Sequence, residues 1–282
     1  MSTLLEPFQF AFFRNGLAVA TLSGALCGLV GTYVVLKGMS YIGHGLSHAI
    51  FGGFAVSALV GFNLFLGAGL WGFASALMIG GVTRRRSIGS DAAIGVITTA
   101  SFAIGLALIK VFGSAGKNPD AYLFGNVLGV DGTQVLLVAL ITVASALVVF
   151  LLYRPLLFST FDPEVADVSG VRTARIDALL MLVLAATILA TMNVIGVVLV
   201  AATLVIPPVV ARMLTNSFSR MLWLSTAIGA ACGFTGMIAS YHLDIPSGPM
   251  IVLTGAGLFA VVFALTGSRG LGRVGGVDAD LA

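Results

Sequence analysis

The sequence predicts an all-α fold, a polytopic transmembrane helical bundle with eight or nine spans, and three observations predict it. Of the 282 residues, 59% are hydrophobic and 9% are charged, with a mean hydropathy of +1.10. Soluble domains carry about 25% charged residues, so this composition could not cover a water-facing surface. Uncharged stretches of the ~20 residues that a bilayer helix needs recur along the chain. The 36 glycines lie inside these stretches, where small residues let helices approach closely.

Nine apolar stretches are candidate spans within a single transmembrane domain over residues 1–282. Pro207-Pro208 interrupts the seventh, and a proline pair kinks or ends a helix because it removes backbone donors. Very short separators also allow one or two stretches to be half-spans. The Gly-rich segment Gly267–Ala282 is expected to be a disordered tail. The candidate spans are Leu17–Leu36, Ile42–Gly61, Leu64–Val82, Ala92–Val111, Gln134–Leu152, Ile176–Met192, Val194–Leu214, Met221–Tyr241 and Pro249–Thr266.

The basic residues set the expected orientation, because lysine and arginine are retained on the cytoplasmic side. Alternation through nine spans puts the arginine clusters on that side and the N-terminus outside. The segments Phe112–Thr133 and His242–Gly248 then also lie outside. A net charge of +3, placed in short loops, indicates topology and not nucleic-acid binding. The clusters are Arg84-Arg85-Arg86, Arg154 with Arg172 and Arg175, Arg212 with Arg220, and Arg269 with Arg273.

Two of the three histidines, His44 and His48, are candidate metal ligands. On a helix, residues at i and i+4 share a face, so both imidazoles could meet one ion. An ionisable residue inside a membrane segment is costly and usually functional. The alternative is that both rings only hydrogen-bond neighbouring helices. His242 and Asp244 lie together in a predicted loop and are further candidate ligands. The sequence contains no HExxH motif, which argues against an intramembrane zinc protease.

The segment Asp162–Gly170 is expected to form a short helix between two spans on the cytoplasmic side. Asp162 suits the N-cap, Pro163 the first helical position, and Glu164 the positive end of the helix dipole. Gly170 would end the helix. Such a helix could dock into a groove on a partner, or it could be an ordinary loop helix.

Six blocks in order, spread between Tyr41 and Thr266, resemble permeases of the zinc/manganese/iron (ABC-3 type) ABC transporter family. No single block is specific, but six in register are hard to obtain by chance. The blocks are Tyr41–Gly53, Asp91-Ala92-Ala93-Ile94-Gly95, Tyr122-Leu123-Phe124-Gly125, Asp162–Gly170, Val205-Ile206-Pro207-Pro208-Val209-Val210-Ala211-Arg212 and Asp244-Ile245-Pro246-Ser247-Gly248.

The resemblance implies a fold like that of type II ABC importers and gives roles to two of the blocks. His48 corresponds to a histidine that binds the metal in the translocation path. His44 stands where many members have aspartate, and nitrogen ligands suit zinc better than manganese. The helix Asp162–Gly170 corresponds to the coupling helix that contacts the ATPase, which makes Asp162, Pro163, Glu164 and Gly170 the expected coupling residues.

The implied function is import of zinc or manganese, or of iron, by alternating access in a bacterial plasma membrane. The implied partners are cytoplasmic ABC ATPase subunits, an extracytoplasmic metal-binding protein and a second permease chain, as a homodimer or heterodimer. The chain itself is expected to hold no cofactor and to catalyse no reaction. Rival interpretations are a secondary metal transporter or channel driven by an ion gradient, a siderophore- or corrin-importing permease, and an intramembrane enzyme.

The expected orientation separates the two groups of candidate ligands. It places His44 and His48 in the inner half of the second span, and His242 and Asp244 outside, up to ~30 Å away. One site could hold all four only if helices break or tilt, which the glycines near His44 permit. Otherwise His242 and Asp244 receive the ion first, or simply cap the loop.

Overall fold

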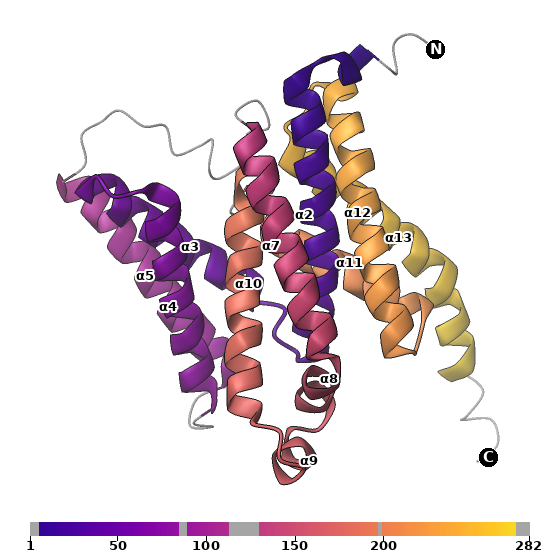
Figure 1. Cartoon of the computed structure of the whole chain (residues 1–282). Helices are drawn as coiled ribbons and strands as arrows, with labels where there is room; N and C mark the ends of the chain where they lie inside the picture. The colour runs from indigo at the N-terminus through magenta and orange to yellow at the C-terminus, as the bar shows by residue number, and fades with distance from the viewer. Residues whose placement is uncertain (1–5, 85–88, 113–129, 197–198, 275–282) are drawn as a thin grey trace.

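The computed structural model describes residues 6–84, 89–112, 130–196 and 199–274, and all regular structure in these residues is helical (Figure 1). The predicted all-α bundle is therefore confirmed. The block Tyr122–Gly125 lies outside the described residues. The elements are η1 (Glu6–Gln9), α2 (Ala11–Leu36), α3 (Ile42–Val60), α4 (Leu64–Arg84), α5 (Ser90–Phe112), α7 (Gly132–Leu151), α8 (Tyr153–Phe161), α9 (Pro163–Val168), α10 (Thr173–Ile195), α11 (Val200–Leu214), α12 (Phe218–Leu243) and α13 (Ser247–Val274).

Eight of these helices are long and apolar enough to cross a membrane, namely α2, α3, α4, α5, α7, α10, α12 and α13. Helix α11 has 15 residues, which span about 22 Å and fall short of the ~30 Å hydrocarbon core. The start of α2 and the end of α13 lie at opposite ends of the bundle (Figure 1). Opposite ends require an odd number of passes, so α11 makes the return pass between α10 and α12.

The seventh predicted span, Val194–Leu214, divides because α10 ends at Ile195, where Gly196 caps it with a positive φ of 90°. The proline pair inside α11 does not end that helix, which continues to Leu214. Pro208 has no N–H group to donate the usual helical hydrogen bond to the Leu204 carbonyl. That carbonyl instead lies against Gly31 of α2, where a β-carbon would collide with it. Close packing on α2 thus accommodates the prolines.

Helix α2 lies at the centre of the bundle and packs antiparallel against α12 through small residues (Figure 1). Gly24 meets Gly229, and Gly28 meets Ser225, so closely that a β-carbon on either glycine would clash with the opposing backbone. The Ser225 hydroxyl donates a hydrogen bond of 2.6 Å to the Gly28 carbonyl. Backbone contact of this kind is typical of transmembrane helix pairs.

The outer helices of the bundle have the most exposed apolar surface. Among the eight candidate spans, α2 and α3 bury the largest share of their residues, and α7 and α13 the smallest. Helix α13 continues to Val274, although we expected the tail to begin at Gly267; residues 275–282 lie outside the described part. The exposed leucines and valines of α7 and α13 suit contact with lipid.

Candidate functional site

His44 and His48 lie on one face in the first two turns of α3, as the i, i+4 spacing predicts. Their ring centroids are 4.5 Å apart and their planes are nearly perpendicular. Both side chains are half-buried between neighbouring helices. The Ser47 hydroxyl donates a hydrogen bond of 2.8 Å to the His44 backbone carbonyl, so its proton is not donated to either imidazole ring. The pair is close enough for both imidazoles to bind the same ion.

The surroundings of the pair are aromatic and tightly packed. Phe102 of α5 lies 4.8 Å from the His48 ring, and Tyr41 lies 5.6 Å from the His44 ring, both measured between centroids. Gly45 lets α3 approach Thr98 of α5, because a β-carbon there would contact the threonine side chain. The buried Nδ1 atom of His48 has no hydrogen-bond partner in the described part of the protein. A nitrogen in that state is available as a metal ligand.

His242 and Asp244 are not brought to this pair. His242 lies in the last turn of α12 with an exposed side chain, and its ring meets only the edge of Tyr241 among the ring contacts of the described residues. Asp244 is exposed and has a left-handed φ of 54°, a conformation that aspartate tolerates better than most residues. It therefore ends α12, which is the loop-capping role considered above. A role for either residue in metal binding stays a prediction.

Within the described residues, no three side chains from histidine, cysteine, aspartate and glutamate lie together in a group that could hold one ion. The His44–His48 pair is thus the centre of the candidate site, with two nitrogen ligands from this chain. A four-coordinate ion would need further ligands beyond this pair.

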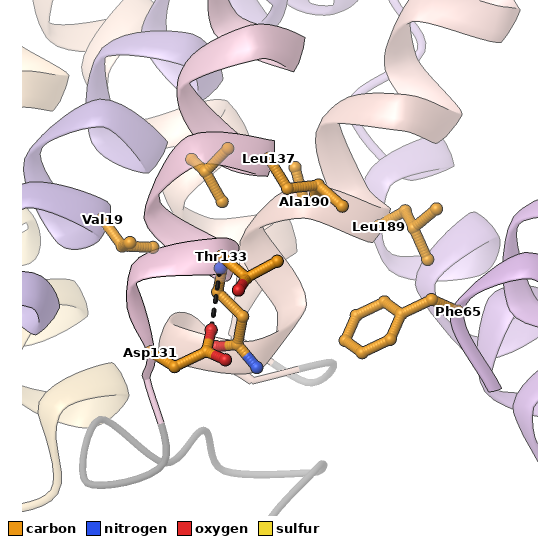
Figure 2. A pocket seen from close by; sticks show the side chains of 9 residues that line it. Val19, Phe65, Asp131, Thr133, Leu137, Leu189 and Ala190 are labelled. Carbon is orange, nitrogen blue, oxygen red and sulfur yellow. Dashed lines mark hydrogen bonds between the residues drawn. The ribbon is translucent and has the colours of Figure 1, made fainter. Parts of the chain in front are cut away.

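A separate cleft of about 230 Å³ lies between α2, α4, α7 and α10 (Figure 2). Its walls are mostly apolar, with Phe65 and Leu189 on one side and Val19 on the other. The carboxylate of Asp131 faces the cleft but accepts a hydrogen bond of 2.8 Å from the Gln134 N–H, which makes it the N-cap of α7. None of the three histidines lines this cleft, and Asp131 is the one charged residue among the described residues that line it.

Helix α9 has the capped structure that the sequence predicts. The Asp162 carboxylate accepts a hydrogen bond of 3.0 Å from the Val165 N–H, and Pro163 occupies the first helical position. Gly170, with a φ of 83°, ends the helix, and the Val171 N–H donates to the Ala166 carbonyl at 3.0 Å. Val168 in this helix is 92% exposed, and α9 lies at the end of the bundle opposite the start of α2 (Figure 1). The role of Asp162, Pro163, Glu164 and Gly170 in coupling stays a prediction.

Sequence reasoning missed a polar cluster beside α9. The Lys37 ammonium lies 2.8 Å from an Asp177 carboxylate oxygen and 3.0 Å from both the carbonyl and the hydroxyl oxygen of Ser159. The Ser159 hydroxyl also donates to Asp177 at 2.6 Å. A charged residue at position 177, inside the predicted span Ile176–Met192, was the one signal that could have indicated it.

Comparison with known proteins gives concordant matches over almost the whole chain. The profile of the ABC 3 transport family matches residues 9–266. The "Manganese transport system membrane protein MntC" of Halalkalibacterium halodurans is 36% identical over 94% of this chain and 91% of that protein. The "Probable iron transport system membrane protein" of Haemophilus influenzae is 36% identical over 94% and 98%. The structure of PsaBC from Streptococcus pneumoniae in complex with Fab has a TM-score of 0.82 and 32% identity, and the match covers 93% of this chain and 95% of that chain.

Proposed function

We propose that this chain, which belongs to the ABC 3 transport family, is the membrane-spanning permease of an ABC importer for a divalent transition metal. The chain is a multi-pass protein of the cell membrane. Manganese is the first candidate substrate, because relatives aligned over nine-tenths of the chain are named as manganese transport proteins. One relative is named as an iron transport protein, so the wider class is divalent transition metals.

The observation that carries this proposal is the His44–His48 pair at the start of an apolar span. Ionisable side chains are costly within a membrane, and two imidazoles with one unpartnered nitrogen suit a metal ion passing through. Tyr41, beside His44, is 52% exposed. A second copy of the chain could cover this surface and supply the ligands that the pair lacks.

The ligand set bears on the choice of metal. Imidazole nitrogen suits zinc, whereas carboxylate oxygen suits the harder manganese ion. The resemblance implies aspartate at the position of His44 in many members, and an imidazole there favours zinc relative to those members. The names of the relatives favour manganese, and the choice depends on direct competition between the two ions.

The transport cycle we propose is alternating access powered by separate ATPase subunits. A metal-binding protein would deliver the ion at the outer face, where His242 and Asp244 are exposed. At the other end, α9 would dock on the ATPase through its exposed face, which includes Val165 and Val168. The permease itself would bind the ion weakly enough to release it and would hydrolyse nothing.

The test is metal uptake by cells that lack their own high-affinity system. We expect the chain, expressed with its partner subunits, to restore uptake of radioactive manganese or zinc. His48→Ala should abolish uptake while expression and membrane insertion persist. Gly257→Ala in α13, where a new β-carbon meets open space, is the control and should leave uptake unchanged. Normal uptake by His48→Ala would remove the pair from the mechanism.

A further inference from the structure

Lys37 is the C-cap of the central helix α2, and its side-chain ammonium has a hydrogen-bond acceptor for each of its protons. Its three ammonium protons are matched by three acceptor atoms, the Asp177 carboxylate and the two oxygens of Ser159. The lysine side chain is 12% exposed and the aspartate side chain 29% exposed. Ser159 is buried. Removing one member of this pair is expected to destabilise the protein, because it would leave the other charge unpaired in a poorly solvated position.

The three residues come from segments on both sides of α9. Ser159 is in α8, which leads into the α9 N-cap, and Asp177 is in the first turns of α10, which follows α9. Helix α9 has 6 residues, and a helix that short is unstable alone. Its orientation is therefore set by α8 and α10, and both of these are held to α2 by the ammonium of Lys37.

On its other side, Lys37 is followed within a few residues by the candidate metal site in α3. Gly38, with a φ of 67°, reverses the chain directly after Lys37. The Met39 N–H donates to the Val34 carbonyl at 3.0 Å, which fixes this turn on the end of α2. Only the turn then separates Lys37 from Ile42, where α3 begins, and His44 follows in the first turn. Because Lys37 is bonded to both α8 and α10, a shift of either helix would move Lys37. The short turn after Lys37 would then move the start of α3.

We propose that Lys37, Ser159 and Asp177 are positioning residues that transmit movement of α9 to the histidine pair in α3. The inference rests on the proposed function, because it assigns the route by which an ATPase docked at α9 would open or close the metal site. The ion pair between Lys37 and Asp177 connects the end of α2 to α10. Ser159 is hydrogen-bonded to both charged groups and so fixes the distance between them.

The first experiment measures amide hydrogen exchange on the purified chain in detergent, and it does not depend on transport. Asp177→Asn, which alters α10, should accelerate exchange in the turn 38–42 as well as in α9. Lys37→Met, which alters α2, should accelerate exchange in α9. Lys110→Met removes an exposed lysine at the far end of α5 and should change neither segment. Unchanged exchange in α9 on substitution of Lys37 would overturn the proposed connection.

The second experiment measures metal ions moved per ATP hydrolysed by the complete transporter in liposomes. In Lys37→Met this ratio should fall by about tenfold, while ATP hydrolysis continues. Lys37→Arg keeps a charge with several donors and should retain most of the ratio. A residue that only stabilises the fold would lower both rates together and leave the ratio unchanged, which would refute the role in coupling. Failure of the unaltered transporter to move metal would instead refute the proposed function, and the exchange experiment would still decide whether the connection exists.

Discussion

The contact between α2 and α12 makes a quantitative prediction about Gly24. A β-carbon at Gly24 would lie within 3.0 Å of both the carbonyl carbon and oxygen of Gly229. These are backbone atoms, so no side chain can rotate away, and the two helices must separate by roughly 1 Å to restore ordinary contact. The separation would strain the hydrogen bond between Ser225 and the Gly28 carbonyl, one turn further along α2.

The expected cost of Gly24→Ala follows from these contacts. Overpacking costs about 1–3 kcal/mol and loss of one hydrogen bond about 0.5–1.5 kcal/mol, against a helix-propensity gain of about 0.5–1 kcal/mol for alanine over glycine. We therefore expect the free energy of unfolding to fall by about 0.5–4 kcal/mol. The control is Gly257→Ala in α13, where a new β-carbon meets open space. That variant gains the propensity and loses no contact, so it should be as stable as the unaltered chain or more so.

Unfolding in detergent can be followed through tryptophan fluorescence, because Trp223 is in α12 and stacks on Phe150 at a centroid distance of 5.3 Å. The two glycine variants should unfold at clearly different temperatures. Equal stability of Gly24→Ala and Gly257→Ala would mean that α2 and α12 do not approach at backbone distance, and the packing argument would fail.

Three further predictions concern the site and α9. His44→Asp should shift preference toward manganese in a competition assay with zinc, because the carboxylate is the harder ligand; an unchanged preference would place selectivity outside His44. Asp162→Ala should destabilise α9 by about 0.5–2 kcal/mol through loss of the hydrogen bond from the Val165 N–H, seen as faster amide exchange in α9 alone. Glu164→Lys places a cation at a helix N-terminus, unfavourable by about 0.3–1 kcal/mol. It should abolish co-purification of the ATPase while metal binding persists, and retained association would argue against docking at α9.

The features predicted correctly from the sequence are those that depend on local chemistry or on the bilayer. The spans follow from apolar runs, because a backbone in lipid must satisfy its own hydrogen bonds. The caps of α9 and the shared face of His44 and His48 depend on residues a few positions apart. Two expectations of this kind failed: the proline pair, which α11 accommodates through its contact with α2, and the tail expected from Gly267, where α13 continues to Val274.

Features that depend on distant contacts could not be predicted. Lys37 lies 122 positions from Ser159 and 140 from Asp177. The charge at position 177 within an apolar stretch predicts a partner, but it does not identify Lys37 or Ser159 as that partner. The meeting of Gly24 with Gly229 is of the same kind. The position of His242 and Asp244 relative to the histidine pair likewise depended on the path of whole helices, so the sequence alone left several arrangements open.

The most direct test of the central claim is metal flux into liposomes that contain the purified chain with and without its ATPase subunits. The account predicts flux of manganese or zinc only when the ATPase and ATP are both present, and no flux in His48→Ala under the same conditions. Metal flux from the single chain, driven by a proton gradient and indifferent to ATP, would contradict it.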